Sequence, residues 1–244
     1  MKQVFRCFGY DLLSTDYAQE FLPSHHLSRV FKRLQIKCVL DVGANLGQYR
    51  DFLREKVGFD GSILSFEPIP SHVEILKAKA KDDKQWTVYD FALGAEGGNS
   101  EINVMQGGEL SSFLSPSETS PAMTVKSRVM VTVRTLNSIA YLVEEICPIQ
   151  FTYLKLDTQG FDLNVIRGGT QVLNRIPALQ AEASLLPIYQ GMPGFLDIYE
   201  HLTHLGFDLS GMFPVFRDDF LRVREFDCVF VNSRALGASV TSGS

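Results

Sequence analysis

Apolar and polar positions along the chain form strand-like runs that alternate with helix-like stretches. The strand-like runs lie at residues 38–42, 61–67, 85–93, 151–157 and 177–184. Between them, apolar residues recur at intervals of three and four, as at 49–57, which is typical of amphipathic helices. This alternation predicts an α/β fold with a mostly parallel sheet flanked by helices. The last two runs, 207–212 and 226–232, predict an antiparallel pair at the C-terminal edge of the sheet.

The same pattern divides the chain into three parts. Residues 1–35 form an N-terminal extension that ends in a helix, and residues 36–233 form the main domain. Glycine pairs and short alternating runs predict an antiparallel insertion at about 94–134, whose loop is a candidate substrate lid. Residues 234–244 are small and polar, and we expect a disordered tail.

The turn after the first strand is a candidate ligand cradle. Asp41 ends a buried strand, and Gly43, Asn45 and Gly47 lead into the next helix. Open α/β sheets bind ligands at the carboxyl ends of their strands, and glycines permit close backbone approach. The spacing Asp-x-Gly-x-x-x-Gly fits neither the dinucleotide fingerprint nor the P-loop. We predict that these four residues bind a cofactor.

Acidic residues also end the next two strands. Glu67 is placed to accept hydrogen bonds from ribose hydroxyls, and Asp90 from an adenine amino group, with Phe91 against the ring. Three carboxylates would repel the pyrophosphate of NAD or ATP and suit an uncharged or cationic adenosyl ligand. Two helix caps are also predicted: a capping box at Ser71 and Glu74, and Asn137 before the helix 138–145.

The motif at 154–162, Leu-Lys-Leu-Asp-Thr-Gln-Gly-Phe-Asp, followed by Gly168-Gly169, resembles the signature of the FkbM-type methyltransferases. The cradle resembles the first motif of class I S-adenosylmethionine-dependent methyltransferases. The resemblance covers residues 36–233 and implies a Rossmann-like class I methyltransferase fold, S-adenosyl-L-methionine as cofactor and a hydroxyl of a natural product or sugar as acceptor. Asn137 and Gln159 depart from the more usual Asp and Glu of that family.

Methyl transfer to an aliphatic hydroxyl requires a base, and Asp157 and Glu182, at neighbouring strand ends, are the candidates. His25 and His26 are alternative candidates for the base. In a further alternative, Asp157 and Glu182 hold a Mg²⁺ ion together with substrate oxygens. The residues expected to contact substrate lie on the same rim: Ser111, Ser112, Lys155, Gln159 and Tyr189.

Composition narrows the setting. The 244 residues carry a formal charge of −5, which argues against nucleic acid or an anionic membrane as partner. The four cysteines lie far apart, and the first residues lack the apolar core of a signal peptide, so we expect no disulfide, no metal site and a cytoplasmic protein. The partner is then a small-molecule acceptor, and a homodimer remains open. A non-catalytic adenosyl-ligand sensor or assembly factor is the alternative function.

Overall fold

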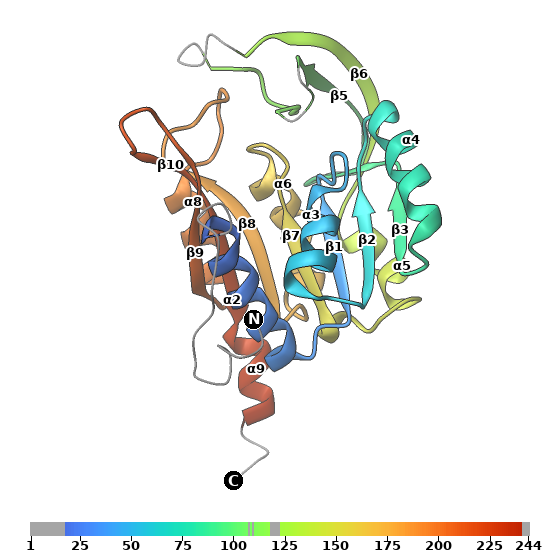
Figure 1. Ribbon diagram of the computed structural model, residues 1–244, viewed down its shortest axis with the longest axis vertical. Coiled ribbons are helices and arrows are strands. Elements are labelled where there is room, and N and C mark those ends of the chain that lie inside the picture. The colour runs from blue at the N-terminus through green and yellow to red at the C-terminus, as the bar shows by residue number, and fades with distance from the viewer. Residues whose placement is uncertain (1–17, 107, 109, 118–122, 241–244) are drawn as a thin grey trace, which may run out of the picture.

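The computed structural model describes residues 18–106, 108, 110–117 and 123–240. Its main sheet has seven strands (Figure 1). In spatial order these are β3 Trp86–Tyr89, β2 Ser62–Phe66, β1 Cys38–Val42, β7 Thr152–Leu156, β8 Ala178–Ser184, β10 Val223–Asn232 and β9 Phe207–Arg217. The first five are parallel, and β10 runs antiparallel to both of its neighbours. The predicted α/β class, with an antiparallel C-terminal strand, is confirmed.

Helices cover both faces of this sheet. They are α2 Ala18–Leu34, α3 Gln48–Phe52 with the π-helix η2 Leu53–Val57, α4 Pro70–Lys79, α5 Ala140–Glu144, α6 Asp162–Arg167, α7 Thr170–Leu173, α8 Phe195–His204 and α9 Ser233–Val240. Strand residues alternate between two apolar clusters, so that Leu40 and Val42 belong to one and Val39 to the other. The second cluster includes Leu27, Val30 and Phe31 of α2, as the predicted apolar face requires.

The insertion at 94–134 forms an arm beside the main sheet. Its strands β5 Gly98–Met105 and β6 Val125–Arg134 pair antiparallel, as predicted. A short strand, β4 Ala92–Leu93, joins β6 to complete a second, three-stranded sheet. The arm arches over the carboxyl ends of the parallel strands (Figure 1).

Three local predictions differ from the structure. The run 85–93 is not one strand: β3 stops at Tyr89, and the chain crosses at Asp90 into the second sheet. Pro70 occupies the first turn of α4, so Ser71 lies inside the helix and forms no capping box. Asn137 caps α7 instead of the helix that follows it, because its Oδ1 accepts the N–H groups of Gln171 and Val172 at 3.1 and 3.2 Å.

Part of the predicted tail lies within the described residues, where it forms a helix. Helix α9 covers Ser233–Val240, and residues 241–244 lie outside the described part of the chain. The buried Asn232 anchors this helix, since its Oδ1 accepts the Ala235 N–H at 3.0 Å and its Nδ2 donates to Leu173 and Ile176. Within the described residues, no helix combines the length and apolar character that a membrane span requires.

Candidate functional site

Polar side chains form two rows across one face of the main sheet, near the carboxyl ends of the parallel strands. In the first row Asp41 of β1 is paired with Lys155 of β7, which is paired with Gln180 of β8. In the second, Glu182 of β8 is opposite Asp227 of β10. Each alternates with buried apolar neighbours, so the period of two along a strand sends all five side chains to the same face.

The cradle turn is held by packing of one loop on another. Gly43 has φ +79°, and a Cβ there would lie 1.9 Å from the Asp157 carbonyl oxygen. Gly47 has φ +90°, and a Cβ there would meet the Trp86 ring at 2.9 Å. The glycines are therefore required by the loop after β7 and by the core, which differs from the ligand approach that the sequence suggested. Gly43 still lines the site, whereas Gly47 does not.

Asp41 is fully buried and lines neither cavity, so the geometry gives no support to its predicted role as a direct cofactor ligand. Its Oδ2 accepts a hydrogen bond from Ser65 Oγ at 2.9 Å, and Ser65 Oγ accepts one from Trp86 Nε1 at 2.9 Å. Its Oδ1 lies 3.3 Å from Lys155 Nζ. Asp41 thus acts on the site through Lys155.

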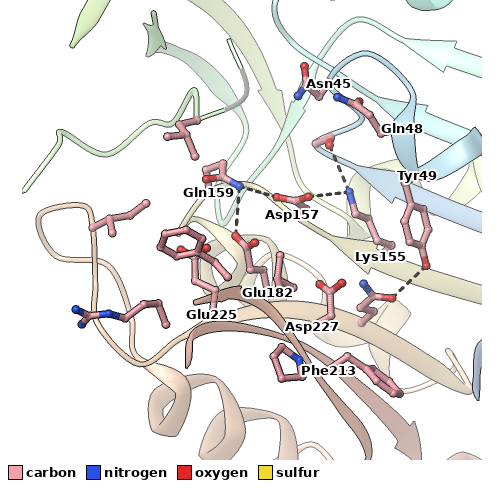
Figure 2. Close-up of a pocket in the computed structure, with 18 of the residues that line it drawn as sticks. Asn45, Gln48, Tyr49, Lys155, Asp157, Gln159, Glu182, Phe213, Glu225 and Asp227 are labelled. Carbon is pink, nitrogen blue, oxygen red and sulfur yellow. Dashed lines mark hydrogen bonds and ion pairs between the residues drawn. The ribbon is translucent and has the colours of Figure 1, made fainter. Parts of the chain in front are cut away.

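Lys155 connects this buried chain to the cavity. Its Nζ lies 3.3 Å from Asp157 Oδ2 and 5.0 Å from the centre of the Tyr49 ring (Figure 2). Burial alone would lower the pKa of Lys155, but the carboxylates of Asp157, Asp41 and Asp227 outweigh it and raise this pKa. Lys155 is therefore a fixed ammonium that holds Asp157 in place.

Glu67, the residue predicted to bind the ribose hydroxyls, follows β2 directly. Its two oxygens accept the backbone N–H groups of Asn45 at 2.8 Å and Ile69 at 2.9 Å. Asn45 has φ +48°, and its side-chain Oδ1 is buried without a hydrogen-bond partner. Each Glu67 oxygen retains a lone pair, so this corner offers three acceptor positions to a ligand with donors.

Asp90 and Phe91 lie away from this corner. Asp90 is 66% exposed and forms an ion pair with Lys77 at 2.9 Å. Phe91 is buried beside Phe66, with the Arg134 guanidinium 4.4 Å from its ring centre. Neither lines the large or the small cavity beside Asp157, so the geometry gives no support to their predicted contact with adenine. The crossing at Asp90, which the sequence did not reveal, removes both from the sheet edge.

A single amide joins the two candidate bases. Gln159 Nε2 donates to Asp157 Oδ1 at 2.9 Å and lies 3.3 Å from Glu182 Oε2 (Figure 2). Gln159 Oε1 faces the Tyr189 hydroxyl at 3.1 Å, and this hydroxyl donates to the Leu110 carbonyl at 2.7 Å. The predicted residues Asp157, Gln159, Glu182 and Tyr189 therefore form one network.

The predicted serines of the arm play different parts. Ser112 is buried, and its Oγ donates to the Gln159 carbonyl at 2.7 Å, which ties the arm to the network. Ser111 Oγ donates to the Gly108 carbonyl at 2.8 Å and closes the turn of the arm. Ser111 lines a cavity, whereas Ser112 positions Gln159.

Two acidic residues of β10 belong to the site but were not predicted from the sequence. Glu225 and Asp227 line the cavity beside Glu182 (Figure 2). Burial and then the charge of Asp157 raise the pKa of Glu225 and raise that of Asp227 to about 6. Burial, followed by the charges of Asp157 and Glu225, raises the pKa of Glu182 well above its usual range. Their spacing, with Phe226 between them, was the available signal, because alternation places them on one face of β10.

Two cavities meet at this network. A large one of about 1660 Å³ lies over the sheet between α2, α3 and the β9–β10 hairpin, and a small one of about 70 Å³ lies between Glu67 and the arm. Both are lined by Gly43, Asn45, Asp157 and Gln159. The two cavities are therefore adjacent and share one wall.

Across residues 18–106, 108, 110–117 and 123–240, no group of three or more His, Cys, Asp or Glu side chains is arranged to hold a metal ion. Asp162 is committed elsewhere: its carboxylate accepts hydrogen bonds from the Thr158 side chain, the Thr158 N–H and the Glu182 N–H.

Comparisons with known proteins identify the family and the fold. The family model for the methyltransferase FkbM domain matches residues 41–209. A search of curated protein sequences gives no match. Among solved structures, a methyltransferase FkbM from Methylobacillus flagellatus superposes with a TM-score of 0.52 at 15% identity, over 80% of this chain and 43% of that chain. The chain therefore spans less than half the length of that relative, and at this identity the similarity establishes the fold alone.

A second solved structure is magnesium protoporphyrin IX methyltransferase from Synechocystis with bound S-adenosylmethionine. It covers 94% of this chain and 90% of its own at 12% identity, with a TM-score of 0.44. This score is too low to support an argument about this protein.

Proposed function

The chain belongs to the FkbM methyltransferase family, and we propose that it transfers a methyl group from S-adenosylmethionine to a hydroxyl oxygen of a small molecule. Family membership supports S-adenosylmethionine as the methyl donor. One observation supports a hydroxyl as the acceptor. Glu182, a carboxylate with a raised pKa, lines the large cavity. It lies beside Asp157, which belongs to the wall that both cavities share.

The residues of the small cavity suit the cofactor. The unpartnered Asn45 Oδ1 and the free lone pairs of Glu67 are acceptors for the hydroxyl and amino groups of an adenosyl ligand. A volume of about 70 Å³ is well below the roughly 300 Å³ of an ordinary ligand pocket. Gly108, Ser111 and Phe113 of the arm form one wall, so an adenosyl group requires this wall to move outward.

The cofactor, when bound, supplies an electrophilic methyl group. Glu182 takes the proton of the acceptor hydroxyl, while the oxygen forms its new bond to the methyl carbon and the carbon–sulfur bond breaks. An aliphatic hydroxyl is a weak nucleophile, and a positioned base contributes about 10² to 10⁴ in rate. Glu182 suits this task better than Asp157, since Asp157 is already paired with Lys155 and Gln159.

A binding and transfer experiment tests this proposal. We expect calorimetry to show binding of S-adenosylhomocysteine and no heat from NAD. We also expect methyl-labelled cofactor to give a labelled ether with at least one member of a panel of neutral alcohols, in excess chelator. Heat from NAD alone would refute the assignment. Cofactor binding without transfer to any alcohol would favour the adenosyl-ligand sensor, and activity lost only in chelator would favour Mg²⁺ held by Asp157 and Glu182.

A further inference from the structure

The mouth of the large cavity is lined by exposed apolar side chains. Leu110 is 40% exposed, Leu186 51%, Val215 53% and Phe216 54%, and all four line the cavity. Single exposed apolar residues are ordinary on a protein surface, but a group that rims one opening marks a binding surface. The mouth is therefore suited to an apolar ligand group.

Three separate segments build this mouth, and hydrogen bonds hold them together. Leu110 belongs to the arm, Leu186 to the loop after β8, and Val215 and Phe216 to β9. The Tyr189 hydroxyl fastens the Leu110 carbonyl to the loop at 2.7 Å. The N–H of Leu185 donates to the carbonyl of Arg224 at 2.8 Å, which fastens the same loop to β10. The loop after β8 thus links the arm and β10 around the mouth.

The floor below the mouth is acidic. Glu182, Glu225 and Asp227 line it. Two cations, Lys155 and Arg224, also line the cavity. Both are already engaged, Lys155 by Asp41 and Asp157 and Arg224 by Asp218. In the β9–β10 pairing, Phe216 is opposite Glu225 and Phe213 is opposite Asp227. Glu225 and Asp227 of β10 are therefore each opposite a phenylalanine of β9. The apolar wall and the acidic floor thus meet along this strand pair.

We propose that the acceptor is amphipathic and carries no anionic group near its hydroxyl. Its apolar portion lies against Leu186, Val215 and Phe216, and its polar end reaches the floor at Glu182. The hydroxyl in this statement rests on the proposed function, whereas the apolar portion rests on the mouth itself. A cavity of about 1660 Å³ exceeds the roughly 300 to 1000 Å³ of ordinary ligand pockets, which leaves room for an extended acceptor.

The test uses alcohols that differ only in chain length. Butanol, hexanol and octanol are titrated by calorimetry into the protein saturated with S-adenosylhomocysteine, with octanoate as the anionic counterpart of octanol. Each methylene buried in the mouth should tighten binding by about two- to fourfold. Octanoate should bind at least about tenfold more weakly than octanol, because the floor repels it. Equal affinity along the series, or no heat from octanol, would overturn the proposal.

Two matched variants locate the effect. Phe216→Ser should weaken octanol binding by about tenfold and leave butanol little changed. Phe220→Ser, at the hairpin tip, should bind all three alcohols as wild type does, because Phe220 is 80% exposed and does not line the cavity. Circular dichroism of both variants checks that they fold. An equal loss in Phe220→Ser, together with sedimentation of wild type on phosphatidylcholine vesicles, would make the surface a lipid-docking site and overturn the proposal.

Failure of the proposed function gives a different result. Chain-length-dependent binding without any methylated alcohol would refute hydroxyl methylation and support the amphipathic ligand. Methyl transfer at equal efficiency to butanol and octanol would support hydroxyl methylation and overturn the amphipathic ligand.

Discussion

The two cavities that meet at Asp157 each contain a glutamate, and the two glutamates have different hydrogen-bond partners. In the small cavity, each oxygen of Glu67 accepts a backbone N–H at 2.8 or 2.9 Å. In the large cavity, the Glu182 carboxylate has the Gln159 amide at 3.3 Å and four carboxylates around it, and burial together with these charges raises its pKa. A carboxylate satisfied by backbone donors is a fixed acceptor that suits ligand binding. A buried carboxylate with a single amide donor and other carboxylates nearby holds its proton more tightly and suits proton transfer.

The largest effect expected from this difference is on turnover. Glu182→Gln should lower kcat by about 10² to 10⁴ and leave the affinity for S-adenosylhomocysteine nearly unchanged, since Glu182 does not line the small cavity. Glu182 must be ionised to accept a proton, so wild-type activity should rise with pH through its raised pKa. The variant should lose this acidic limb, which a pH profile of kcat measures.

Asp157→Asn is the comparison that separates the two carboxylates. It removes the ion pair with Lys155 but leaves Glu182 as base, so activity should fall while the acidic limb remains. The reverse result, with the limb lost in Asp157→Asn and kept in Glu182→Gln, would make Asp157 the base.

The next effect is on cofactor affinity. Glu67→Gln should weaken S-adenosylhomocysteine binding by about 1.5 to 3 kcal/mol, the scale of hydrogen bonds to a charged group. The same change should lower the free energy of unfolding by about 1 to 3 kcal/mol, because one of the two buried backbone N–H groups would then face the amide nitrogen of glutamine, which accepts no hydrogen bond. Calorimetry and urea denaturation measure the two effects. Glu74→Gln, on an exposed position of α4, is the control and should change neither.

Much of this fold follows from local patterns in the sequence. The cradle, the parallel strands and the antiparallel arm were all predicted from periodicity and turn residues. The β3 strand was predicted too long because Tyr89, Phe91 and Ala92 are all apolar and favour continuation. Its end is decided by the pairing of Ala92 with Val133, which is distant in sequence.

The site was predicted where a motif or a predicted strand end names the residue. Asp157 and Glu182 lie at predicted strand ends, and Gln159 belongs to the turn of the 154–162 motif. The structure brings these three together. Glu225 and Asp227 escaped because β10 enters the sheet between β8 and β9, and nothing local indicates that its face joins the floor. Asn137 was assigned to the nearest helix, while its partners lie 34 and 35 residues away.

The acidic floor should also affect stability through Asp227. Burial and the charge of Asp157 raise the pKa of Asp227 from the 3.8 of a free aspartate to about 6, so the folded state binds the proton more tightly. The resulting stabilisation is complete below about pH 3.8 and is lost as pH rises through about 6. Asp227→Asn should therefore raise the free energy of unfolding relative to wild type above about pH 6, by about 1 to 3 kcal/mol, and change it little at pH 4. Asp60→Asn, which removes an exposed charge, should show no such pH dependence.

The smallest effect concerns the hydroxyl that links the two cavities. Tyr189→Phe removes the hydrogen bond to the Leu110 carbonyl and the contact with Gln159 Oε1, and keeps a ring that is 2% exposed. One net hydrogen bond contributes about 0.5 to 1.5 kcal/mol, so Tm should fall by a few degrees. Because Gln159 would then be held less firmly between Asp157 and Glu182, kcat should fall by up to about tenfold while S-adenosylhomocysteine affinity is retained. Ser112→Ala loosens Gln159 from the arm side through its carbonyl, and should give a similar loss. Wild-type kcat in both variants would show that the arm and the carboxylates act independently.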